Sequence, residues 1–386
     1  MRRLLFLVVL LSLLAACGGG GNAVPPPLPT TPPLPPAPVN VDESEIVPTV
    51  VVANANKVEV PGRLLFVRNE PRGTGNGATG NIWLVAGDST RRVTSSGKKY
   101  HAAWSPDGSR IAYIQREESF ADVWVMNPNA ADKIQITNNE PSGIDARSEE
   151  HILSVKWAFY PRWSNDGSVL AYVSQLTPPE FVTTEVPREY PLSLYLYGAR
   201  RIDDGTIADA SFQRLVKPDT DLSHPTWATD DSLLVYTQVE RCYGNSCTDG
   251  AMQLGFYVPE TDVAGVLQGD DADVFIDAMD AAFSPDGKWL AYIKRDGNTS
   301  DVWVVPAPGV DGVANGTPVK LTTAERVRMP TWSPDSRKLA YFIAKDNLVS
   351  LTISDVTTTN GKLSLANPVE VQKDTLDIDS GMSWVR

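Results

Sequence analysis

Short segments that end in an aromatic residue recur along the chain, and most of them run straight into a tight polar turn. The aromatic residues are Trp104, Trp163, Trp227, Phe283, Trp332 and Trp384, spaced 49 to 64 residues apart. Five copies read HAAWSPDG (101–108), YPRWSNDG (160–167), HPTWATDD (224–231), DAAFSPDG (280–287) and MPTWSPDS (329–336). This spacing is typical of one propeller blade, a four-stranded sheet that buries its faces only by stacking on neighbours. The repeats therefore predict an all-β propeller with six blades.

Each repeat predicts the same order of strands. The aromatic residue ends the first strand, and a turn follows in which Pro presets φ and Gly accepts a positive φ. Short apolar runs bounded by Gly, Pro and Asn favour strands over helices. Second strands are expected at 111–114, 170–173, 234–237, 290–293 and 339–342; third strands at 122–126 and 301–305; fourth strands at 133–137 and 319–322.

The first and last parts of the propeller are each incomplete. Residues 63–68, 81–85 and 91–94 predict a second, third and fourth strand without a first, whereas the terminal GMSWVR predicts a first strand alone. Pairing of the C-terminal strand with the N-terminal blade would complete six blades and remove exposed sheet edges. We therefore expect one closed propeller over residues 58–386.

The W-S-P-D-G, L-A-Y and D-V-W repeats resemble the six-bladed, WD-like propeller of the TolB family from about Arg63 onward. The resemblance implies a module that binds proteins in the bacterial envelope. TolB carries a mixed α/β domain ahead of its propeller, whereas a proline-rich arm takes that place here. Peptidases of the prolyl-oligopeptidase type have similar repeats, but this sequence contains no G-x-S-x-G motif, so we do not expect a serine peptidase.

The N-terminal residues predict export and lipid attachment. Met1-Arg2-Arg3 precedes the apolar residues 4–14, which are too few to span a bilayer, and Leu14-Ala15-Ala16-Cys17 matches the bacterial lipobox. We expect residues 1–16 to be a signal peptide and Cys17 to be lipidated. An ordinary secretory signal and a retained anchor are the alternatives. The Gly- and Pro-rich segment 17–57 is expected to be a tether, and the mature protein to be extracytoplasmic, on an outer membrane or on the outside of a single membrane.

Charge and cysteine content limit the partners. The formal net charge of −13 argues against nucleic-acid binding, which depends on clustered Lys and Arg. Cys242 and Cys247 are predicted to form a disulfide, because export exposes them to an oxidising compartment. A metal site at this pair is not expected, since no further ligands lie near it in sequence. We expect a monomer that touches lipid only through its anchor.

The best candidate site lies at the mouth of the central channel. The residues three before each aromatic, which propeller topology places near that mouth, are His101, Tyr160, His224, Asp280, Met329 and Gly381; Arg162 lies two residues after Tyr160. His101, Tyr160, Arg162, His224 and Asp280 are therefore candidate binding residues. His and carboxylate groups can hold a divalent cation or transfer protons. Alternatively, they fill the mouth and bond to neighbouring strands; no catalytic residue, metal ligand or cofactor is assigned.

Carboxylates gather in the segments that lead into the first strands. This acidic rim comprises Asp219, Asp221, Asp273, Asp277, Asp377 and Asp379. Such a rim would attract cationic peptide segments or, through its oxygens, calcium, although no EF-hand spacing supports calcium. A merely solvated surface is the simpler interpretation.

These observations together predict a lipid-anchored envelope module that docks a protein or peptide on the loop face or in the channel. The alternative from another class is a carbohydrate-active propeller, resembling uronate lyases that use manganese, with His101 and His224 at its mouth. A third possibility is a spacer within an envelope assembly. Fold analogy alone is a weak guide to function, because propellers host unrelated activities.

Overall fold

The structure is a computed structural model, and it describes residues 51–53, 60–71, 78–141, 143–145, 148, 156–175, 193–198, 212–215, 220–240, 252–271, 274–323 and 326–386. All of these belong to one compact unit. The described residues form strands and turns, and none of them lies in a helix long and apolar enough to cross a membrane.

Six antiparallel sheets make up this unit, which confirms the predicted all-β fold with six blades. Blade 1 contains β25 (Met382–Val385), β2 (Val60–Pro71), β3 (Ala78–Gly87), β4 (Ser89–Arg92) and β1 (Val51–Ala53). Blade 2 contains β5 (Lys99–Trp104), β6 (Ile111–Arg116), β7 (Ala121–Met126) and β8 (Ile134–Gln135); blade 3 contains β9 (Ala158–Trp163), β10 (Val169–Ser174), β11 (Ser193–Gly198) and β12 (Phe212–Leu215).

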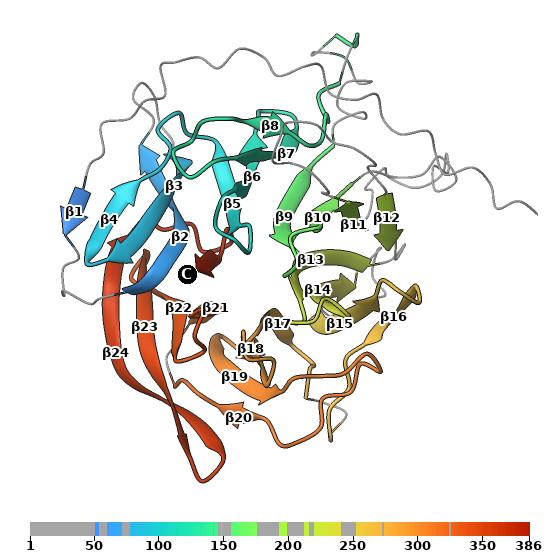
Figure 1. The fold of residues 1–386 in the computed structure, drawn as a ribbon, viewed down its shortest axis with the longest axis vertical. Helices are drawn as coiled ribbons and strands as arrows, with labels where there is room; N and C mark the ends of the chain where they lie inside the picture. The colour runs from blue at the N-terminus through green and yellow to red at the C-terminus, as the bar shows by residue number, and fades with distance from the viewer. Residues whose placement is uncertain are drawn as a thin grey trace, which may run out of the picture. The chain divides into compact units, whose positions relative to one another are not determined.

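The other three blades follow the same order. Blade 4 contains β13 (Thr220–Trp227), β14 (Leu234–Glu240), β15 (Met252–Val258) and β16 (Val263–Val266). Blade 5 contains β17 (Ala278–Phe283), β18 (Trp289–Asp296), β19 (Thr299–Pro306) and β20 (Val319–Lys320). Blade 6 contains β21 (Val327–Trp332), β22 (Lys338–Lys345), β23 (Leu348–Thr359) and β24 (Lys362–Asp374). In Figure 1 the blades surround a central axis, and the first strand of each blade lies nearest to it.

The chain ends close the ring as expected. β25 pairs antiparallel with β2, so the last strand becomes the first strand of blade 1. The Trp384 indole nitrogen donates to the Pro61 carbonyl at 2.6 Å. Gly62 lies beside this junction with φ +74°, and a Cβ there would sit 2.2 Å from the Val385 carbonyl oxygen. Only glycine combines that backbone conformation with so close an approach.

β1 is an addition to blade 1. It pairs with β4, the outer edge of the blade, through the register Val51 to Arg91 and Ala53 to Ser89. These residues fall within segment 17–57, which the sequence led us to assign to the tether. An outer strand leaves backbone N–H and C=O groups unpaired, and an added strand satisfies them.

The buried core lies largely between adjacent blades. The tyrosines of the second strands are all nearly inaccessible: Tyr113, Tyr172, Tyr236, Tyr292 and Tyr341. Clusters of apolar residues join neighbouring blades, as where Leu65 of blade 1 packs in one cluster with Trp104 of blade 2. Stacking of this kind is what a blade needs in order to bury both of its faces.

Threonine and acidic side chains explain why the fourth strands are shorter than predicted. The Thr137 hydroxyl accepts the Val123 backbone N–H at 3.0 Å and donates to an Asp122 oxygen at 2.8 Å. In blade 5, the Thr322 hydroxyl likewise accepts the Val302 backbone N–H and donates to an Asp301 carboxylate oxygen. The hydroxyl thus replaces the next backbone bond of the ladder, and the strand ends. The Asp of each D-V-W motif fixes this arrangement.

The repeated S-P-D-G turns are built by their own side chains. The Ser105 hydroxyl donates to an Asp107 oxygen at 2.6 Å and accepts the Arg110 N–H at 2.9 Å. The serines of three other turns make the same hydroxyl bond: Ser164, Ser284 and Ser333. These acids form turns, so we do not count them as site residues.

Candidate functional site

Every blade carries a backbone irregularity at the residue three before its aromatic. That residue has a positive φ in all six blades: His101 (52°), Tyr160 (53°), His224 (49°), Asp280 (53°), Met329 (55°) and Gly381 (65°). The ladder between first and second strands shifts register at this point in blades 2 to 6. A left-handed conformation costs a non-glycine residue about 1–3 kcal/mol. Six repeated left-handed positions, five of them at bulges, therefore shape the channel wall at one level.

An ion pair lies at the centre of this level. The Arg328 guanidinium binds the Asp280 carboxylate through two nitrogens: its Nε contacts Oδ2, and its Nη2 donates to Oδ1 at 3.1 Å. The Met329 backbone N–H also donates to Oδ2, at 3.3 Å. The Asp280 side chain is only 1% exposed, so its charge depends on these donors.

Two histidines and a tyrosine extend the cluster. The His224 Nδ1 lies 3.8 Å from an Asp280 oxygen, and its Nε2 lies 3.3 Å from the Asp379 carbonyl. The Tyr160 hydroxyl donates to Asp379 Oδ2 at 3.0 Å. Its ring contacts both imidazoles, with centroids 4.3 Å from His101 and 4.0 Å from His224. We call His101, Tyr160, His224, Asp280, Arg328 and Asp379 the channel cluster.

The protonation states follow from burial and charge. Burial alone would raise the pKa of Asp280, but the Arg328 charge and the accepted hydrogen bonds outweigh it and lower that pKa. Burial lowers the pKa of His101 to about 4. Burial also lowers the pKa of His224, although Asp280 and Asp379 oppose the shift. Burial, with the nearby Asp379 charge, raises the pKa of Tyr160. At neutral pH the cluster therefore holds neutral imidazoles, a phenol that donates, and an ionised acid paired with arginine.

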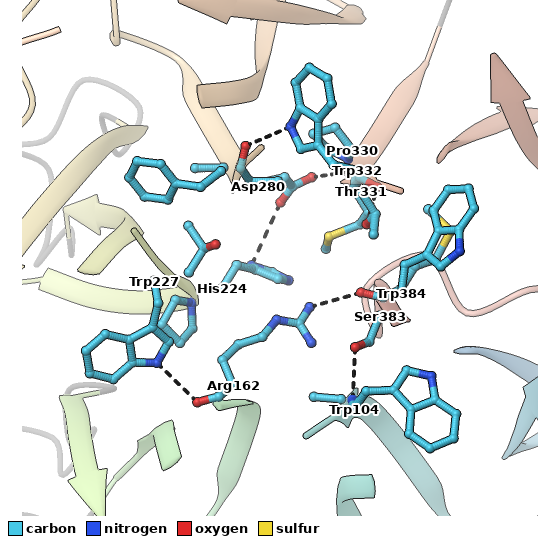
Figure 2. A pocket seen from close by; sticks show the side chains of 18 of the residues that line it. Trp104, Arg162, His224, Trp227, Asp280, Pro330, Thr331, Trp332, Ser383 and Trp384 are labelled. Carbon is cyan, nitrogen blue, oxygen red and sulfur yellow. Dashed lines mark hydrogen bonds and ion pairs between the residues drawn. The ribbon is translucent and has the colours of Figure 1, made fainter. Parts of the chain in front are cut away.

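The cluster separates two cavities along the channel. We call the side with the turns between second and third strands the loop face, and the side with the S-P-D-G turns the turn face. The loop-face pocket has a volume of about 500 Å³ and is lined by Tyr160, Asn298, Arg326 and Asp379, among others. The turn-face cavity, of about 220 Å³, is lined by Arg162 and the channel aromatics (Figure 2). His224 and Asp280 line both, so they lie between the two.

The structure brings four of the five candidate binding residues together. His101, Tyr160, His224 and Asp280 join the channel cluster, whereas Arg162 faces the turn-face cavity without contacting Asp280. Asp280 is deeply buried instead of lying at a rim. The indole nitrogens of Trp227 and Trp332 donate to carbonyls of the preceding blade, at 3.3 and 3.1 Å (Figure 2).

The described carboxylates of the acidic rim each have an interaction partner, and that of Asp277 is a cation. Asp277 pairs with Arg295 at 2.8 Å. Asp377 accepts hydrogen bonds from a side chain and a backbone N–H, at 3.1 and 2.9 Å. Asp379 is half exposed and accepts from Tyr160. Asp221 also has an interaction partner. Outside the described residues lie Cys17, Asp219, Cys242, Cys247 and Asp273.

Sequence reasoning missed the most important partner, Arg328. Arg328 neutralises Asp280 from the neighbouring blade. A usable signal existed: Asp280 occupies a ring position that points into the channel, and a buried carboxylate needs a counter-charge. Arg326 and Asn298, which line the loop-face pocket, lie in segments without any distinctive motif.

Several polar groups of the channel cluster are already engaged with one another. The Asp280 oxygens are engaged by Arg328 and Met329, and Tyr160 directs its proton to Asp379. Within the part of the chain that the structure describes, no group of three or more His, Cys, Asp or Glu residues is placed to hold a metal ion. A catalytic base needs a free lone pair beside a substrate proton, and among these groups the His101 Nδ1 is the buried nitrogen without a hydrogen-bond partner in the described structure.

Fold and channel together define a closed, six-bladed β-propeller. The similar solved structures include TolB from Acinetobacter baumannii, 17% identical with a TM-score of 0.52, which covers 84% of this chain and 66% of that one. They also include a putative TolB from Agrobacterium tumefaciens, 13% identical with a TM-score of 0.51, covering 84% of this chain and 93% of the other. At these identities the likeness establishes the fold alone. It confirms the predicted resemblance to TolB-type propellers at that level.

Sequence comparison adds little beyond the fold. A protein described as an uncharacterized peptidase, YuxL of Bacillus subtilis, is 24% identical over 249 residues, which is 56% of this chain and 32% of that protein. This chain thus spans about a third of the curated relative that it matches. No family model matches the chain.

Proposed function

We propose that this protein is an extracytoplasmic docking module, lipid-anchored through Cys17, which binds a peptide segment of an envelope protein in its loop-face pocket. The observation that carries the proposal is the pocket of about 500 Å³ whose floor is the channel cluster. A segment that enters from the loop face would stop at His224 and Asp280, because these groups lie between the pocket and the cavity beyond. Loops held by a rigid scaffold are common binding surfaces.

The walls of this pocket come from several blades. Tyr160, His224, Asn298 and Arg326 belong to blades 3, 4, 5 and 6, and Asp379 precedes the closing strand. Arg326 is exposed, and no ion pair of it occurs among the described residues. The Asp379 side chain is 54% exposed. A segment carrying both signs of charge would match this lining better than the purely cationic one that an acidic rim would attract.

The lyase-like alternative gains no specific support from the site. It requires both imidazoles to face one substrate or one metal ion. Instead Tyr160 contacts both rings, and the His101 Nδ1 is buried without a hydrogen-bond partner in the part of the structure that is described. Binding therefore accounts better for the groups that are engaged in the described part of the structure.

The proposal is tested by crosslinking capture from native envelopes with the full-length protein as bait. The informative variant is Arg326→Glu, which reverses an exposed charge at the pocket. The matched control is Lys288→Glu on the turn face, where the Lys288 side chain is 70% exposed. We expect the native bait and the control to retain the same partner, and Arg326→Glu to lose at least five-sixths of it. Equal capture by all three baits, or no captured partner with any of them, would count against loop-face docking.

A further inference from the structure

The turn-face cavity contains a guanidinium without a carboxylate partner. Arg162, on β9, extends toward the channel axis in Figure 2. One of its terminal nitrogens donates to the Met382 carbonyl, at a long 3.5 Å. No ion pair of Arg162 occurs among the described residues, in contrast to Arg328 on the other side of the cluster. A guanidinium has five N–H donors, so most of its bonding capacity is available for another group.

A glycine lies next to this side chain. Gly381 occupies the ring position of blade 1, and a Cβ built on it would lie 3.4 Å from Nη2 of Arg162 and 3.4 Å from Sδ of Met329. A larger residue there would press on both side chains. Blade 1 is thus the one place in the ring where no side chain enters the channel at this level, and the guanidinium occupies that space.

Hydroxyl groups surround the same cavity. Thr226, Thr331 and Ser383 line it, each one residue before the aromatic of its blade. The Ser383 hydroxyl oxygen accepts a hydrogen bond from the backbone N–H of Trp104 at 2.9 Å, and this bond fixes the position of the hydroxyl (Figure 2). The Thr226 hydroxyl has no hydrogen-bond partner within the described residues. The Thr331 hydroxyl donates to the Met329 carbonyl at a long 3.4 Å and would exchange that bond for one to a ligand. The cavity therefore offers one cation and hydroxyl donors to a bound molecule.

The charge of the lining selects the kind of anion. Asp280 also borders the cavity, but Arg328 neutralises it, so Arg162 supplies a net charge of about one. Burial lowers the pKa of Arg162 only to about 10, so the group is still charged at neutral pH. An unpaired buried charge is unfavourable, and a single negative charge beside it would offset the loss of hydration. A planar carboxylate also matches the fork of donors on arginine.

We infer that the turn-face cavity is a binding site for a small monocarboxylate, held by the Arg162 guanidinium and the hydroxyls of Thr226, Thr331 and Ser383. Its volume of about 220 Å³ leaves room for a small organic acid. The channel cluster separates this site from the loop-face pocket. The two ligands would therefore enter from opposite faces, and either site could exist without the other.

Tryptophan fluorescence of the full-length protein provides the test, because Trp104, Trp227, Trp332 and Trp384 line the cavity. Sodium lactate and sodium acetate serve as probes, with sodium sulfate as the dianion, at ionic strength held constant with chloride. We expect a saturable change with the monocarboxylates and a response at least tenfold weaker with sulfate. Arg162→Gln should weaken lactate binding at least tenfold. The matched control, Arg337→Gln, changes an exposed arginine on the turn face and should bind as the native protein does.

A second variant keeps the test decisive if Arg162→Gln fails to fold. Thr226→Val is nearly isosteric and removes only a hydroxyl, so loss of one hydrogen bond should weaken lactate binding about threefold to tenfold. The inference is overturned if native protein gives no saturable response, if sulfate acts as strongly as lactate, or if the folded variants bind lactate like the native protein.

Discussion

Replacing Arg328 by methionine tests the ion pair on which the channel cluster depends. The substitution keeps the aliphatic part of the side chain but leaves the Asp280 carboxylate with the Met329 N–H at 3.3 Å and His224 Nδ1 at 3.8 Å. Asp280 is 1% exposed, so its carboxylate depends on the few donors that remain. Breaking a buried pair from one side costs about 3–5 kcal/mol of unfolding free energy. We expect a loss in that range at pH 7.

The double variant Asp280→Asn, Arg328→Met separates charge from packing. With both charges removed, only hydrogen bonds are lost, so we expect its unfolding free energy to fall by about 1–2 kcal/mol, less than for Arg328→Met alone. Urea titrations followed by tryptophan fluorescence give all the values. The charge account fails if Arg328→Met loses less than 1 kcal/mol at pH 7, or if the double variant is the less stable of the two.

The same variants have a characteristic pH dependence. In the native protein the pKa of Asp280 is below its ordinary value, so its stabilising contribution is present above the unfolded pKa of about 4 and is lost as pH falls through the folded pKa. Without Arg328, burial raises the pKa of Asp280, so its ionised carboxylate destabilises the folded protein instead of stabilising it. The loss of unfolding free energy caused by Arg328→Met, relative to the native protein, should therefore shrink from pH 7 toward pH 4. The loss caused by the double variant should stay constant. A deficit that does not change with pH would contradict this assignment.

Three further changes test the local fold by thermal or urea unfolding. Thr137→Val should cost about 1–3 kcal/mol, because the Val123 N–H loses its buried acceptor, and Thr137→Ser should restore most of it. Asn347→Gly should stabilise the protein by a few tenths to about 1 kcal/mol, since φ is 63° at this hairpin turn; a lower stability would refute that reasoning. Gly62→Ala should destabilise blade closure by more than 1 kcal/mol, as its Cβ would meet the Val385 carbonyl; native-like stability would argue against this closure.

Much of the fold could be predicted because the repeat is carried by residues with clear local roles. Turn residues and alternating apolar strands located the blades, and the solitary Trp384 strand indicated the closure that β2 and β25 make. The fourth strands were predicted too long, because pattern alone does not reveal that Thr137 replaces a backbone bond with its hydroxyl. β1 was missed, because nothing in a Val-Val-Ala segment beyond a proline-rich arm specifies pairing with a distant outer strand.

The site could be predicted only in part. Ring positions brought His101, Tyr160, His224 and Asp280 to one level, as the spacing from each aromatic suggested. The contacts among these residues could not be deduced. They depend on the ion pair between Arg328 and Asp280, which lie in neighbouring blades and 48 residues apart in the sequence. The positive φ of these residues could not be predicted either, because His, Tyr and Asp in a strand do not indicate a left-handed backbone as glycine does.

The most direct test of loop-face docking places a photoreactive benzoylphenylalanine at Asn298, an exposed residue of the loop-face pocket, in the full-length protein in native envelopes. A second probe at Lys288 marks the turn face. We predict that illumination gives one discrete adduct from Asn298, that Arg326→Glu abolishes it, and that Lys288 gives none. An adduct formed only from Lys288, or one from Asn298 that survives Arg326→Glu unchanged, would contradict a partner bound in this pocket.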